Sequence, residues 1–196
     1  MSNIQSKSKQ IHTNALLVLN ELQLENILSQ VGRIFFTGSY ALDLMVWNDI
    51  DCQVVFKEEV DPLEGFMQLV KMLFQLKGIA SIKLINFNEN PKNGMPKGLY
   101  LGFNYHSPKL GNWKIDVWHL NDDDFKENQR FMAALSNLLT DESRELLLQW
   151  KFQLMGDSKR VPHLGSYALY QAILFEGLNN NEDIRQYLNK QGINLL

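Results

Sequence analysis

An apolar, strand-like segment that carries two aspartates constrains this chain more than any other feature. Residues 48–55 read Asn-Asp-Ile-Asp-Cys-Gln-Val-Val, so Asp49 and Asp51 alternate with Ile50 and Cys52. Side chains alternate between the two faces of a strand, so both carboxylates project together, away from the apolar side chains. Such carboxylates repel each other unless a cation lies between them, and Mg²⁺ binds a few carboxylates together with substrate phosphates. The pair therefore indicates half of a metal–nucleotide site.

A third carboxylate extends this site. Asp116 lies between Ile115 and Val117 in a predicted strand, and a carboxylate in apolar surroundings is costly to bury unless it is paired or binds a metal. If this strand neighbours the first, Asp116 faces the same side as Asp49 and Asp51. Three carboxylates can then hold two divalent ions about 3.5–4 Å apart. The first ion would activate an attacking hydroxyl, and the second would hold the triphosphate. Asp116 would bind only the first ion and help to deprotonate the hydroxyl.

The pattern of apolar residues predicts a strand-rich half followed by a helical half. We expect a helix over 11–31, a strand over 33–37, a short helix over 40–47, a strand over 49–56, a helix over 62–77 and strands over 81–87, 99–105 and 113–120. From about residue 125 the apolar period is helical. The sequence therefore predicts an α+β fold, with domains over 1–122 and 123–196.

Composition and charge narrow the class of protein. The 196 residues are 45% hydrophobic and 21% charged, which is typical of a globular protein. The net charge of −3 gives no overall basic field for nucleic acid. The single cysteine, the polar start and the short apolar runs predict a cytoplasmic protein without a disulfide, a signal peptide or a membrane span.

The order of these motifs resembles a known family. A Gly38-Ser39 turn, then Asp49-Ile50-Asp51 and later Ile115-Asp116-Val117, is similar to the signature of the DNA-polymerase-beta-like nucleotidyltransferase superfamily, over about residues 33–120. The resemblance implies a small mixed sheet backed by helices and a helical lobe that closes over the nucleotide. It implies that the three aspartates bind metal and catalyse, and that Gly38 and Ser39 bind the triphosphate.

One departure from the family concerns the positive partner of the triphosphate. Many members carry a basic residue and a glycine soon after Gly-Ser, where this chain has Tyr40-Ala41-Leu42. The triphosphate must therefore find a cation elsewhere. Lys114 shares the predicted face of Asp116 and fits either a phosphate contact or an ordinary ion pair.

A shorter resemblance lies in the helical half. Trp150-Lys151, followed by Leu164-Gly165-Ser166-Tyr167, is similar to the central domain of poly(A) and terminal uridylyl polymerases. The resemblance implies phosphate contacts from Lys151 and Ser166 and stacking of Tyr167 on the base. The residues alone favour a lysine whose ammonium extends to solvent, a helix-capping serine and a packed tyrosine.

Together these observations predict a Mg²⁺-dependent nucleotidyltransferase that uses two ions and an NTP such as ATP. Because the chain is short and acidic, we expect a small-molecule acceptor, as in the antibiotic nucleotidyltransferases, while an RNA or protein acceptor stays open. Two alternatives use the same residues. One is a nucleotide-binding or interaction protein without catalysis, which an Asp116 pointing away would support, and the other is a metal-dependent nuclease or phosphatase.

Overall fold

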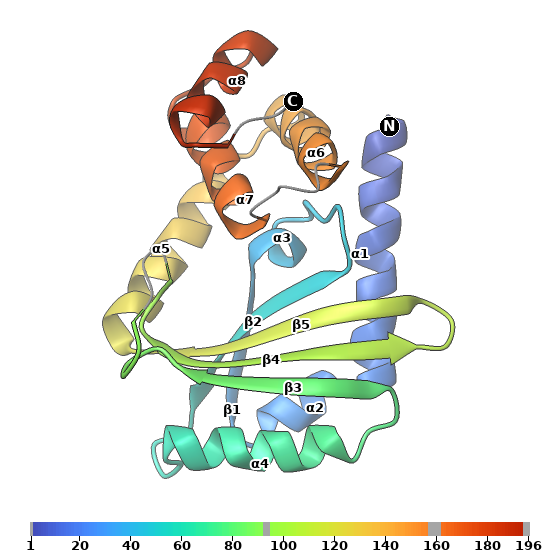
Figure 1. The fold of residues 1–196 in the computed structure, drawn as a ribbon, viewed down its shortest axis with the longest axis vertical. Coiled ribbons are helices and arrows are strands. Elements are labelled where there is room, and N and C mark those ends of the chain that lie inside the picture. Colours follow the sequence, from blue (N-terminus) through green and yellow to red (C-terminus); the bar gives the residue numbers. More distant parts are fainter. Residues whose placement is uncertain (1, 92–94, 157–161, 194–196) are drawn as a thin grey trace.

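A five-stranded mixed sheet forms the first half of the protein (Figure 1). The computed structural model describes residues 2–91, 95–156 and 162–193. The strands are β1 (Gly32–Thr37), β2 (Asp49–Phe56), β3 (Ile79–Asn86), β4 (Gly98–Ser107) and β5 (Gly111–Leu120), in the order β1-β2-β5-β4-β3. The β2 and β5 strands pair in parallel, and the other three pairs are antiparallel. The predicted α+β class is therefore confirmed.

Helices cover one face of this sheet, and the apolar core lies between these helices and the strands. They are α1 (Asn3–Leu22), α2 (Leu24–Ser29) and α4 (Pro62–Phe74), and α4 runs below the strands in Figure 1. Their apolar side chains pack with the alternate positions of β2 and β5 that the sequence assigns to the core, which are Ile50, Cys52, Val54, Ile115 and Val117. The Cys52 thiol is fully buried, and this burial raises its pKa.

Two of the expected helices differ in extent from the structure. The helix expected over 11–31 is interrupted because Gln23 adopts a left-handed conformation with φ of 51°, which separates α1 from α2. The short helix expected over 40–47 is wrong in extent: α3 covers Gly38–Ala41, and Asp43 with φ of 54° redirects the chain toward β2. No glycine marks either turn, so no residue type in the sequence indicates these left-handed conformations.

The helical half contains α5 (Asp122–Leu138), α6 (Asp141–Gly156), α7 (Pro162–Tyr170), the π-helical turn η1 (Gln171–Phe175) and α8 (Asn181–Lys190). These elements share a second apolar core, to which the segment after α3 contributes Leu42, Leu44 and Val46. The first half thus supplies side chains to the core of the second. A division at residue 122 stays a prediction. Within the described ranges, no helix combines the length and apolar character needed to cross a bilayer.

Candidate metal and nucleotide site

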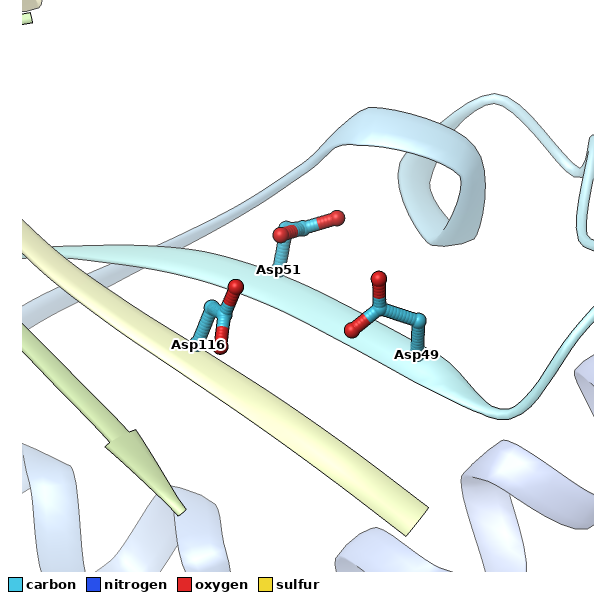
Figure 2. Close-up of side chains that lie close together, drawn as sticks. All are labelled: Asp49, Asp51 and Asp116. Atoms are coloured by element: carbon cyan, nitrogen blue, oxygen red, sulfur yellow. The ribbon is translucent and has the colours of Figure 1, made fainter. Parts of the chain in front are cut away.

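Three carboxylates converge on the sheet face opposite to the helices that back it. The parallel register of β2 and β5 places Asp51 opposite Asp116 and Asp49 opposite Lys114. Figure 2 shows the three aspartates grouped at the two neighbouring strands, and one oxygen from each lies within 4.8 Å of the others. Asp116 therefore faces the same side as Asp49 and Asp51, as the strand alternation predicted.

The electrostatics of this group favour a cation. Burial, followed by the charges of Asp49 and Asp116, raises the pKa of Asp51 to about 8. Burial also raises the pKa of Asp49, although Lys114 opposes this shift. Carboxylate oxygens gathered at this spacing are the ligands that Mg²⁺ prefers, so the residues present fit a divalent ion. Metal binding would stabilise the ionised carboxylates that burial and mutual repulsion disfavour.

Two aromatic side chains and one lysine hold the outer carboxylates. The indole N–H of Trp47 donates to Asp49 Oδ2 at 3.3 Å, and the Tyr100 hydroxyl donates to Asp116 Oδ1 at 2.8 Å. The Lys114 ammonium donates to Asp49 Oδ1 at 3.3 Å and to Asp116 Oδ2 at 2.5 Å. Burial lowers the pKa of Lys114, but the nearby carboxylates outweigh this effect and the net pKa is raised. Lys114 is thus an ion-pair partner of the aspartates and stays charged.

Gly102 makes room for the Tyr100 side chain. This glycine lies opposite Asp116 on β4, and a Cβ atom there would lie 2.1 Å from the Tyr100 hydroxyl oxygen. Such a distance is far inside van der Waals contact, so a larger residue would force the Tyr100 ring away. The absence of a side chain at Gly102 therefore allows the hydroxyl to reach Asp116.

The Gly38-Ser39 turn lies directly beside the carboxylates. Gly38 begins α3 with φ of 62°, and a Cβ atom there would lie 2.8 Å from Asp51 Oδ2. A left-handed conformation and a close approach both favour glycine at this position. Thr37 and not Ser39 is the N-cap residue of α3, and its side chain makes no capping hydrogen bond. The turn therefore places its backbone against the metal-binding side chains.

Lys151 reaches this turn from the helical half. Its side chain is fully buried, and its ammonium donates to Ser39 Oγ at 2.6 Å and to the Tyr170 hydroxyl at 3.3 Å. The ammonium also lies 5.5 Å from the ring centroids of Trp47 and Tyr170, within the range of cation–π attraction. The alternative of an ammonium extending to solvent is therefore wrong. Lys151 contacts the site through Ser39.

Ser166 and Tyr167 both lie on α7, and among the described residues no hydrogen bond or ring contact joins either of them to Lys151. Ser166 is partly buried inside the helix, so the helix-capping alternative is wrong. Tyr167 is 53% exposed, and its ring lies 5.6 Å from that of Phe131 on α5, so it is not packed in the core. Tyr170, three residues later, is the tyrosine that contacts Lys151. The roles of Ser166 and Tyr167 in binding nucleotide stay predictions.

The mixed sheet, the helices behind it and the helical half form a fold that is similar to that of solved nucleotidyltransferases. The Cid1 poly(U) polymerase bound to MgGTP matches with a TM-score of 0.58 and 16% identity, over 89% of this chain and 51% of that chain. A second Cid1 structure, described for its RNA terminal uridylyl transferase activity, matches with a TM-score of 0.60 and 14% identity, over 85% and 47%.

A cytoplasmic RNA terminal U-transferase also matches, with a TM-score of 0.53 and 14% identity, over 88% of this chain and 56% of that chain. The chain thus spans about half the length of the solved proteins that it resembles. At this level of identity the likeness establishes the fold alone. No protein-family model and no curated protein sequence matches the chain.

Proposed function

We propose that this protein is a Mg²⁺-dependent nucleotidyltransferase that moves a nucleoside monophosphate from an NTP to an acceptor hydroxyl. The observation that carries the proposal is the convergence of Asp49, Asp51 and Asp116 on one face of a sheet with the nucleotidyltransferase fold. In this reaction the acceptor oxygen bonds to the α-phosphorus, and the bond from that phosphorus to the pyrophosphate oxygen breaks.

The three aspartates would hold two Mg²⁺ ions. Asp49 and Asp51 would contribute to both ions, and Asp116 would bind only the first. The bound ions would polarise the phosphate oxygens and neutralise the charge that develops during transfer. Asp116 is oriented by the Tyr100 hydroxyl, so its carboxylate is held in a fixed position from which to accept the proton of the acceptor hydroxyl. Catalysis would otherwise consist of positioning.

The Gly38-Ser39 turn would bind the triphosphate. Because the Lys151 ammonium donates to Ser39 Oγ, the hydroxyl proton of Ser39 is directed elsewhere and can be donated to a phosphate oxygen. Lys151 would also add positive charge behind the turn, which partly replaces the basic residue that many members of the superfamily carry after Gly-Ser. Ser166 would give a further phosphate contact, and the exposed Tyr167 ring would stack on the base.

Two acceptor classes are supported by different observations. The net charge of −3 favours a small, cationic molecule of the antibiotic type over a polyanion. The likeness to terminal uridylyl transferases extends over 85–89% of the chain, which includes the helical half, and favours an RNA 3′ end. We propose the small molecule as the acceptor and keep the RNA end as the second candidate. A protein hydroxyl stays a third possibility.

The two rival functions make different predictions for the same site. A binding protein without catalysis would be supported by an Asp116 that points away, but Asp116 faces the other two aspartates. A nuclease or phosphatase would consume NTP or nucleic acid without forming an acceptor adduct. The distinction therefore depends on the products.

The test is a transfer assay with each α-³²P-labelled NTP, Mg²⁺ and two separate acceptor pools, one of aminoglycosides and related antibiotics and one of short RNAs. We expect labelled adduct in one pool with the wild-type protein, and a loss of at least about a thousandfold in Asp49→Asn and Asp116→Asn. Release of labelled nucleoside monophosphate without adduct would favour hydrolysis. Nucleotide binding without any product would favour the non-catalytic alternative.

A further inference from the structure

Lys114 contacts two of the three aspartates that could hold a metal ion. Its ammonium lies between Asp49 Oδ1 and Asp116 Oδ2, bonded to both. The other oxygen of each carboxylate is held by a neutral donor, Trp47 at Asp49 and Tyr100 at Asp116. The aromatic donors thus turn one oxygen of each aspartate toward a common point, and the ammonium occupies that point.

We infer that Lys114 is an internal substitute for the first metal ion and competes with it for Asp49 and Asp116. This inference rests on the proposed function, because it concerns the same carboxylates. The ammonium already holds one oxygen of Asp49 and one of Asp116, so a divalent ion that used these oxygens would have to displace it. The competition weakens metal binding to the protein without nucleotide.

The structure also shows why Lys114 is the group that moves. Its side chain is 49% exposed, whereas those of Asp49 and Asp116 are 20% and 11% exposed. A lysine has four rotatable side-chain bonds and can swing toward solvent without disturbing β5. Tyr100, by contrast, packs its ring against that of Trp118, with the centroids 4.9 Å apart, while its hydroxyl donates to Asp116.

A consequence concerns the order of binding. An NTP brings additional negative charge to the site, which gives the displaced ammonium a new partner and gives the ion additional oxygen ligands. Metal and nucleotide should therefore bind together far better than the metal binds alone. In the absence of nucleotide, Lys114 would keep the carboxylates ordered and partly neutralised.

The experiment is a Mn²⁺ titration of the nucleotide-free protein, with free Mn²⁺ measured by electron paramagnetic resonance. We expect Lys114→Met to bind Mn²⁺ at least about tenfold more tightly than the wild type, because one cation at contact distance has been removed. The gain should disappear in Lys114→Met/Asp116→Asn, which shows that the ion binds at the three aspartates. Lys114→Gln serves as a second neutral variant if Lys114→Met folds poorly.

Lys83→Met is the matched control, since Lys83 is an exposed lysine on β3 that pairs with Gly102 and so lies on the same sheet face. It should bind Mn²⁺ like the wild type. In EDTA, Lys114→Met should also melt at a lower temperature than the wild type, and Mn²⁺ should raise its melting temperature more.

Four results would overturn the inference. They are equal Mn²⁺ affinity in Lys114→Met and the wild type, no binding by either, an equal gain in Lys83→Met, and a gain that survives Asp116→Asn. The titration contains no nucleotide, so it separates the two proposals. Tighter Mn²⁺ binding by Lys114→Met, with no nucleotidyl transfer by the wild type, would keep this inference and remove the proposed function. Transfer by the wild type, with no gain in Mn²⁺ affinity in Lys114→Met, would do the reverse.

Discussion

Burial and the neighbouring carboxylates both disfavour the ionised form of Asp51. Its pKa is raised to about 8, against a usual value of 3.8, first by burial and then by Asp49 and Asp116. Between these two pH values the unfolded chain has lost the Asp51 proton while the folded protein still holds it. The contribution of Asp51 to the free energy of unfolding therefore falls as the pH rises from about 4 to about 8.

We expect metal-free wild type to lose stability between pH 5 and pH 8.5 relative to Asp51→Asn, whose side chain does not titrate. The slope of the difference should approach about 1 kcal/mol per pH unit, somewhat below the limit for one proton because the aspartates titrate together. Urea unfolding in EDTA across this range measures the effect, and saturating Mg²⁺ should reduce it. Parallel pH profiles for the two proteins would contradict the raised pKa.

At the scale of single elements, the short helix α3 depends on Gly38. This residue has φ of 62°, and a Cβ atom there would lie 2.8 Å from Asp51 Oδ2. Gly177 has a similar φ of 67° but would place a Cβ atom in open space. The two glycines therefore share the cost of a left-handed conformation and differ in the contact with the site.

We expect Gly38→Ala and Gly177→Ala each to lose about 1 kcal/mol in the free energy of unfolding, from backbone strain alone. Only Gly38→Ala should also weaken Mn²⁺ binding, by about tenfold, because the new methyl group displaces the Asp51 carboxylate. Urea unfolding and Mn²⁺ titration of both variants separate the two effects. Unchanged metal affinity in Gly38→Ala would show that Asp51 adapts to the methyl group.

The elements also show what sequence reasoning reached and what it missed. Asp49 and Asp51 were predictable as a pair because strand alternation fixes which side chains share a face, whereas placing Asp116 beside them also required its strand to neighbour theirs. Tyr100 was missed for a related reason. The pattern Leu99, Leu101, Phe103 marks the buried face of β4, so Tyr100 lies on the other face, but its contact with Asp116 depends on the register between β4 and β5.

The ion pair of Lys114 likewise depends on the parallel register of β2 and β5, which places it opposite Asp49. The contact between Lys151 and Tyr170 depends on how α6 and α7 pack, so the sequence did not indicate Tyr170, and the base-stacking role of Tyr167 stays a prediction. Pairing and packing join residues that are far apart in the chain. No local pattern encodes such contacts, which is why the aspartates and Lys114 could be named from the sequence, whereas Tyr100 and Tyr170 could not.

At the scale of the whole molecule, a shared apolar core and a hydrogen bond join the two halves in addition to the chain that connects them. Leu44 follows α3 in the first half, yet it is fully buried in the core of the helical half, beside Leu42 and Val46. The Lys151–Ser39 hydrogen bond joins the halves at the same place. The proposed phosphate-binding turn is thus held from both sides, and its position depends on the packing of the helical half.

We expect Leu44→Ala to lower the free energy of unfolding by about 2–5 kcal/mol, the cost of a cavity at a buried leucine. The protein should still melt in one transition, because the loss affects both halves. Leu138→Ala is the control, since Leu138 is 42% exposed and should change stability little. Calorimetry distinguishes the outcomes: two separate transitions, with only one of them shifted, would support independent domains divided at residue 122.

Cys52 gives the protein a reporter of its own opening. It is the single cysteine of the chain, it lies on β2 between Asp51 and Gln53, and it is fully buried on the opposite face from the carboxylates. An alkylating reagent can reach this thiol only when the sheet separates from α1, α2 and α4, so the rate of labelling counts those openings. A ligand that binds the aspartates of β2 and β5 together would slow the labelling. The rate of Cys52 alkylation would therefore report occupancy of the site from the opposite face of the sheet, without any substitution.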